Sequence, residues 1–66
     1  MAKNAYYVDI KSDWHNKWAN INGFTDIYEA IDYAVNESKT NKEISKVRVW
    51  DRDYDKAILT IDLKTL

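Results

Sequence analysis

Hydrophobic and polar residues alternate in three parts of the chain, and this period of two is typical of β-strands. We expect these strands at residues 5–11, 45–50 and 56–63. In the first of them Tyr6, Val8 and Ile10 fall on one side of the pleat. The last two strands form a hairpin, and its connection at residues 51–55 has no glycine. We therefore predict a longer or bulged loop there instead of a tight two-residue turn.

A helical period replaces the alternation in the middle of the chain. Five apolar residues form one stripe at helical spacing, namely Ile27, Ala30, Ile31, Ala34 and Val35. Thr25 has the side chain of a good N-cap, and Asp26 follows where the positive end of the helix dipole favours an acid. The pattern predicts a helix from Asp26 to Lys39, with Thr25 as its N-cap.

Residues 12–23 allow two interpretations. The first is a turn through residues 12–16 and then a strand at residues 17–21, which would pair with the first strand. The second is a short helix capped by Ser12 or Asp13.

Poor helix formers in this segment favour the strand, and they are Asn20, Ile21 and Asn22. The pair Asn22-Gly23 would end either element, as a turn or as a left-handed helix stop. Both interpretations place Trp14 and Trp18 on roughly the same side, because a spacing of four suits both periods.

These elements predict one α+β domain over residues 1–66 with the order β-β-α-β-β. The expected architecture is a four-stranded antiparallel sheet with one helix packed on one face. A single helix cannot cover both faces of such a sheet. One face is therefore left open, and its composition is the main evidence about function.

Alternation assigns each strand side chain to one of the two faces. The face under the helix receives a mainly apolar set, namely Tyr6, Val8, Ile10, Ala19, Ile21, Val47, Val49, Ala57, Leu59, Ile61 and Leu63. The outward face receives a mixed set, namely Tyr7, Asp9, Lys11, Trp18, Asn20, Lys46, Arg48, Trp50, Lys56, Ile58, Thr60, Asp62 and Lys64. The outward set is aromatic and basic, whereas the exposed side of the helix is acidic.

Overall composition narrows the classes of function. Ten basic and eleven acidic side chains leave the chain nearly neutral, which argues against a dedicated duplex-DNA binder. The absence of cysteine excludes disulfides and thiolate zinc sites. We expect a cytoplasmic protein, because the sequence has no membrane-length apolar segment and no apolar signal region near its N-terminus. Frequent Lys, Ile, Asn and Tyr are typical of AT-rich genomes, including those of many phages and mobile elements.

Candidate chemistry is sparse. His15 lies beside Ser12 and Asp13, but neighbours within one turn do not normally reach the geometry of a catalytic relay. The sequence Asp51-x-Asp53-x-Asp55 begins like a calcium loop, yet the sixth position is lysine where the motif needs glycine. Acidic helix residues could imitate nucleic-acid phosphates, although a solvated helix face explains them equally well. We expect no enzyme activity, cofactor, metal or small-molecule substrate.

The outward face leads to the functional hypothesis. Tryptophan, tyrosine and arginine are enriched at interface hot spots, so the candidate partner-binding residues are Tyr7, Trp18, Arg48, Trp50 and Ile58. We expect a non-catalytic protein-binding module, a phage or mobile-element protein that binds and inhibits a host protein, or one that self-associates. A single-stranded nucleic-acid binder using the same face is the alternative. A third interpretation is a purely structural aromatic cluster.

Overall fold

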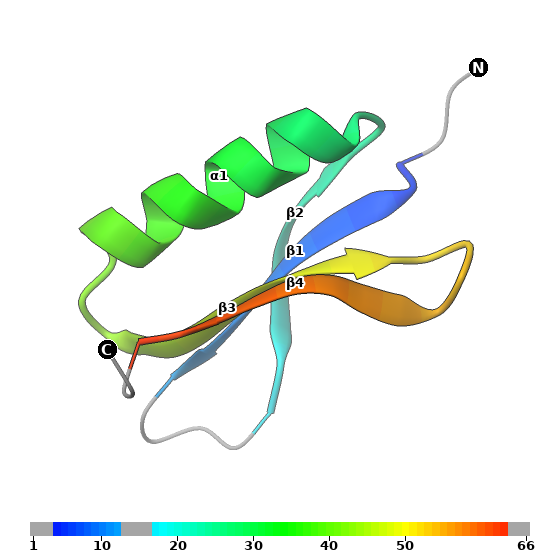
Figure 1. Cartoon of the computed structure of the whole chain (residues 1–66). Helices are drawn as coiled ribbons and strands as arrows, with labels where there is room; N and C mark the ends of the chain where they lie inside the picture. Colours follow the sequence, from blue (N-terminus) through cyan, green and yellow to red (C-terminus); the bar gives the residue numbers. More distant parts are fainter. Residues whose placement is uncertain (1–3, 13–16, 64–66) are drawn as a thin grey trace.

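The computed structural model describes residues 4–12 and 17–63, and it confirms the predicted order of elements (Figure 1). The elements are β1 (Tyr6–Ser12), β2 (Ala19–Phe24), α1 (Ile27–Thr40), β3 (Ile44–Asp51) and β4 (Lys56–Asp62). The strands form one antiparallel sheet in the order β2-β1-β3-β4, and α1 packs against one face of it. The prediction of an α+β fold is therefore confirmed. Within the described residues, no helix is long and apolar enough to cross a membrane.

The core lies between α1 and the two central strands. Val8, Val47 and Val49 are 0% exposed, and Val8 pairs directly with Val49 across β1 and β3. Ala30 and Ala34 are the fully buried residues of α1, and their small side chains let the helix lie close to the sheet. Burying each valine contributes about 1.5–3 kcal/mol, so these few residues supply much of the driving force for folding.

The helix begins one residue later than the pattern predicts. Asp26, and not Thr25, is the N-cap, because its carboxylate oxygen Oδ1 accepts a hydrogen bond of 2.8 Å from the backbone N–H of Tyr28. The predicted end at Lys39 agrees within one residue with the observed end at Thr40. Both residue types make good caps, and the backbone conformation decides between them.

The second strand confirms the strand interpretation over the helix, but it lies further along the chain than predicted. β2 runs through Asn22 and Gly23, which we expected to end it. Gly23 lies opposite Tyr7. A Cβ atom on Gly23 would come within 3.0 Å of the Tyr7 ring, so this close approach explains a glycine inside a strand. Of the turn predicted at residues 12–16, Ser12 is the last residue of β1, and residues 13–16, with Trp14 and His15, lie outside the described residues.

Both edge strands contain a β-bulge. In the β1–β2 pair the register shifts between Val8 and Asp9, because Ile21 is an extra residue of β2. In the β3–β4 pair it shifts between Val49 and Trp50, because Ile58 is an extra residue of β4. Both isoleucines pack against the buried cluster. A bulge breaks the strict alternation of faces, which a pattern with a period of two cannot anticipate.

The bulge at Ile58 corrects three predicted positions. Ile58 packs against the core, so its assignment to the outward face is wrong. Ala57 is exposed and pairs with Trp50 on the outward face, although we predicted it inside. Lys56 pairs with Asp51, which also pairs with Tyr6, and Tyr6 packs against the core, so Lys56 lies on the helix side of the sheet and not on the outward face.

Candidate interaction face

The face of the sheet turned away from α1, called the open face below, is built from directly paired residues of the central strands. Tyr7 lies opposite Trp50, and Asp9 lies opposite Arg48. Side chains of directly opposite residues in an antiparallel pair point to the same face and touch. The register of β1 and β3 therefore gathers two aromatic rings and one ion pair in the middle of the sheet.

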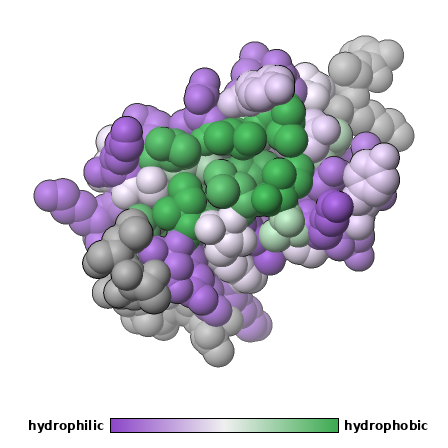
Figure 2. Space-filling model, in the orientation of Figure 1, coloured by the Kyte–Doolittle hydropathy of each residue, from purple (hydrophilic) through white to green (hydrophobic). Residues whose placement is uncertain are grey.

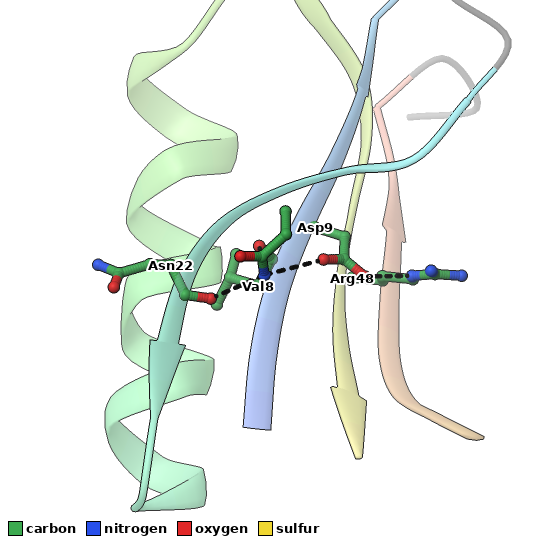
Figure 3. Close-up of polar contacts among 5 residues, drawn as sticks. Val8, Asp9, Asn22 and Arg48 are labelled. Carbon is green, nitrogen blue, oxygen red and sulfur yellow. Dashed lines mark hydrogen bonds and ion pairs between the residues drawn. The ribbon is translucent and has the colours of Figure 1, made fainter. Parts of the chain in front are cut away.

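Arg48 and Asp9 form the polar centre of the open face (Figure 3). The Arg48 Nε donates a hydrogen bond of 2.9 Å to Asp9 Oδ2, and the two side chains are only 21% and 10% exposed. The other carboxylate oxygen of Asp9 accepts a hydrogen bond of 3.2 Å from the Asn20 side chain on β2. Both oxygens of this nearly buried carboxylate are thus satisfied by neighbouring strands.

Two indole rings enclose the guanidinium group of Arg48. Its Cζ atom lies 4.3 Å from the centre of the Trp18 ring and 4.5 Å from the centre of the Trp50 ring. We call this arrangement of three side chains the Trp–Arg–Trp stack. Each cation–π contact contributes about 0.5–2 kcal/mol, depending on how well water is excluded. Trp18 and Trp50 remain half-buried, so the stack is fixed and still partly accessible.

The surroundings of Trp50 differ on its two sides. On the β1 side Tyr7 lies opposite it, and the Tyr7 hydroxyl accepts a hydrogen bond of 3.4 Å from Arg52. On the β4 side its partner is Ala57, which is small and exposed. The β4 side of Trp50 is therefore the more accessible side of the stack.

Four of the five predicted binding residues come together on the open face, namely Tyr7, Trp18, Arg48 and Trp50. The sequence analysis did not predict that Asn20 and Asp9 hold each other by a hydrogen bond beside Arg48, or that Ala57 is exposed. Asp9 and Asn20 were assigned to the correct face, but their contact depends on strand register. No local signal in the sequence reveals the bulge that places Ala57 on the open face.

The basic excess that we expected on this face is smaller in the structure. Arg48 is paired with Asp9, and Lys46 lies 3.8 Å from Asp62. The bulge places Lys56 on the helix side of the sheet and not on the open face, and residue 64 lies outside the described residues. Lys11 remains, with its Nζ 5.9 Å from the centre of the Trp18 ring.

The acidic turn after β3 has a structural explanation. Asp51 Oδ1 accepts hydrogen bonds from the backbone N–H groups of Asp53 and Tyr54, at 3.0 and 3.2 Å. This carboxylate closes the turn as a local cap. The part of the chain that the structure describes brings no three His, Cys, Asp or Glu side chains together in a way that could hold a metal ion.

Comparison of this chain with protein-family models, with curated proteins and with solved structures found no match. We therefore infer function from the geometry of the open face.

Proposed function

We propose that this chain is a small non-catalytic module that binds another protein through its open face. The supporting observation is the Trp–Arg–Trp stack, in which two half-buried indoles are held on a sheet face that α1 does not cover. Large aromatic side chains at fixed positions are the usual anchors of protein interfaces. Tyr7 and the exposed Ala57 extend this surface on either side of Trp50.

Preorganisation supports this function. Binding costs about 0.5–1.5 kcal/mol for each flexible side chain that must be ordered. Here the indoles are already held against Arg48, and Arg48 is held by Asp9. A partner would meet a surface whose central side chains are already in place. The open face would therefore lose little conformational entropy on binding.

The charge distribution favours a protein over a single nucleic-acid strand. A strand binder needs cations that are available to phosphates and aromatic faces that are available to bases. The Arg48 charge is matched by Asp9, and Arg48 occupies one face of each indole. A phosphate at this position would also lie near the Asp9 carboxylate.

The finer points of the proposal rest on composition. The frequent Lys, Ile, Asn and Tyr residues, which are typical of AT-rich genomes, are the reason to propose a phage or mobile-element origin and an inhibitory action on a host protein. The absence of cysteine suits a reducing cytoplasm, where such a partner would be met. Binding of two copies through the open face is the other form that this protein-binding function could take.

The proposal is tested by affinity capture from a cell lysate, followed by mass spectrometry and measurement of the affinity for each purified candidate. The decisive variant is Ala57→Glu, which places a charged side chain beside Trp50 without removing any packing. We expect it to weaken binding at least about tenfold, as burial of an unpaired charge in an interface requires. Trp50→Ala should have an effect at least as large.

Tyr28→Ala is the matched control, because Tyr28 is an aromatic residue on α1 that is 75% exposed. It should leave the affinity unchanged. The proposal fails if Ala57→Glu binds like the unmodified protein while its circular dichroism is unchanged. It also fails if nuclease abolishes capture and the affinity falls steeply with salt, which would establish the nucleic-acid alternative.

A further inference from the structure

The β-bulge of β2 decides on which face of the sheet Trp18 lies. Before the bulge, Asn20 pairs with Asp9 of the open face. Trp18 comes two residues before Asn20, and side chains two positions apart in an extended chain point to the same face. The distance of 4.3 Å between the Trp18 ring centre and Arg48 Cζ agrees with this assignment. The position of Trp18 therefore follows from the register before the bulge.

Without the extra residue the assignment would be reversed. If the register after the bulge continued back to the start of the strand, Ile21 would lie opposite Asp9 on the open face. Trp18 and Asn20 would then turn to the face under α1, because a shift of one residue moves every side chain to the other face. The Trp–Arg–Trp stack can therefore form only in the bulged register.

Packing of Ile21 favours the bulged register. The bulge places Ile21 on the face under α1, where it packs against the buried cluster. In the view of Figure 2, apolar side chains gather in one patch beside the helix, and polar residues surround this patch. A bulge also interrupts the regular pairing of backbone groups. The residues before the bulge therefore need a further contact to hold them in place.

The side-chain amide of Asn20 supplies this contact. Its Nδ2 donates a hydrogen bond of 3.1 Å to the carbonyl oxygen of Asn22, which lies after the bulge, and one of 3.2 Å to Asp9 Oδ1. The carbonyl oxygen of Val8 lies 3.4 Å from the same nitrogen. Figure 3 shows Val8, Asp9 and Asn22 around this point. The amide therefore joins the two sides of the bulge to each other and to the neighbouring strand.

Asn20 is connected to the stack in two ways. Through its amide it holds Asp9, whose other carboxylate oxygen accepts the hydrogen bond of 2.9 Å from Arg48 Nε. Through the backbone it fixes the register, and with it the face on which Trp18 lies. Trp18 and Arg48 are thus both held by a residue that does not belong to the stack.

The residue type at position 20 agrees with this role. Asparagine is depleted in β-strands, where valine or threonine fits better. A donor is needed at this position because the three neighbouring acceptors are oxygen atoms. Aspartate has nearly the same shape, but it would place a second carboxylate against Asp9. Asparagine combines a short side chain with two N–H donors.

We propose that Asn20 is a positioning residue of the open face, whose amide fixes the bulged register of β2 and thereby holds Trp18 against Arg48. The inference rests on the proposed function, since the position of Trp18 affects binding only where the open face is the interface. Asn20 acts through Trp18 and needs no contact with the partner. Because Asn20 is exposed, loss of its amide should release Trp18 without unfolding the domain.

The test is made by NMR on the purified chain with Asn20→Val, which removes the donors and introduces a good strand former. Nuclear Overhauser contacts between the Trp18 ring and the Arg48 side chain should be present in the unmodified protein and lost in the variant. Contacts between Val8 and Val49 in the core should persist, which shows that the domain is folded. Asn20→Asp, which keeps the shape of the side chain, should lose the same Trp18 contacts.

Asn22→Val is the matched control, because Asn22 is an asparagine of the same strand whose side chain accepts a hydrogen bond of 2.8 Å from the neighbouring N–H of Gly23. It should keep the contacts between Trp18 and Arg48. The inference is overturned if both Asn20 variants keep these contacts. It is also overturned if Asn22→Val loses them equally, because Asn20 would then only contribute to the general stability of β2.

Affinity for a captured partner separates the inference from the proposed function. Asn20→Val should weaken binding about threefold to tenfold, and Asn22→Val should leave it unchanged. If Ala57→Glu weakens binding and Asn20→Val does not, the proposed function stands and the inference is overturned. If Ala57→Glu has no effect, the proposed function fails. The NMR contacts need no partner, so they still decide whether Asn20 holds Trp18 in place.

Discussion

The side chains on the two faces of the sheet are shielded from water in different ways. On the open face, Arg48 lies between two indoles and is held by Asp9, so polar and aromatic side chains cover one another. On the other face, α1 covers Val8, Val47 and Val49 of the central strands completely, whereas Leu59 and Ile61 of β4 are only half-buried. A cluster of charged and aromatic side chains can be in contact with water, but an apolar strip needs another element to cover it.

This difference gives the two faces different sensitivities to substitution. The open face depends on one ion pair that is nearly buried, and losing one partner leaves the other without compensation. The helix-covered face depends on packing, which becomes weaker from β3 to β4. A domain of 66 residues has roughly 3–10 kcal/mol of stability, so losses of a few kcal/mol on either face are measurable by urea unfolding.

The largest loss of stability is expected for Arg48→Ala, at about 3 kcal/mol. This change leaves the Asp9 carboxylate, whose side chain is 10% exposed, without its ion pair, and it opens a gap between Trp18 and Trp50. Urea unfolding measures the loss. Replacing both partners, as in Asp9→Asn with Arg48→Met, should recover part of it. A double variant as unstable as Arg48→Ala would show that the ion pair is not the cause.

Val49→Ala should cost about 2 kcal/mol, because it removes two methyl groups from a fully buried position. Val49 lies between Val8 and Leu59 in the register, so the cavity would form in the middle of the core. The midpoint of urea unfolding should fall while the slope stays unchanged. A loss below about 0.5 kcal/mol would mean that the core collapses around the site.

Leu59→Ala should cost only about 1 kcal/mol, although it removes more atoms than Val49→Ala. Leu59 is only half-buried, so part of its surface is already in contact with water. Equal or larger destabilisation than that of Val49→Ala would show that β4 is covered as well as β3. The same measurement on both variants therefore decides whether β4 is less well covered than β3 in solution.

The smallest effect is expected for Lys46→Ala, within about 0.5 kcal/mol. Its ion pair with Asp62 lies on the same face as the Arg48–Asp9 pair, but the atoms are 3.8 Å apart and the side chains are 40% and 34% exposed. Raising the salt concentration should remove even this difference. A loss as large as that of Arg48→Ala would show that exposure does not separate the two pairs.

The sequence predicted the elements well, because each has a local signal. Alternation in β3 is regular from Lys46 onward, and Val47, Arg48, Val49 and Trp50 all lie on the expected faces. The stripe of α1 likewise predicts its two buried residues, Ala30 and Ala34. The N-cap is wrong by one residue, since neighbouring Thr25 and Asp26 have similar propensities and the backbone conformation decides.

The candidate site was predicted less completely. Tyr7, Trp18, Arg48 and Trp50 were found from alternation alone, but their mutual contacts depend on which strands are neighbours. Ile58 was assigned to the wrong face because a single extra residue reverses the alternation after it. The bulge at Ile21 in β2 follows the same rule.

The sequence by itself determined the order of elements, the amphipathic character of α1 and the aromatic composition of the open face, because these features depend on residues a few positions apart. The tertiary structure alone decided the strand order, the bulges, the enclosure of Arg48 and the exposure of β4. These features depend on pairing between residues as distant as Asp9 and Arg48, which no local pattern specifies.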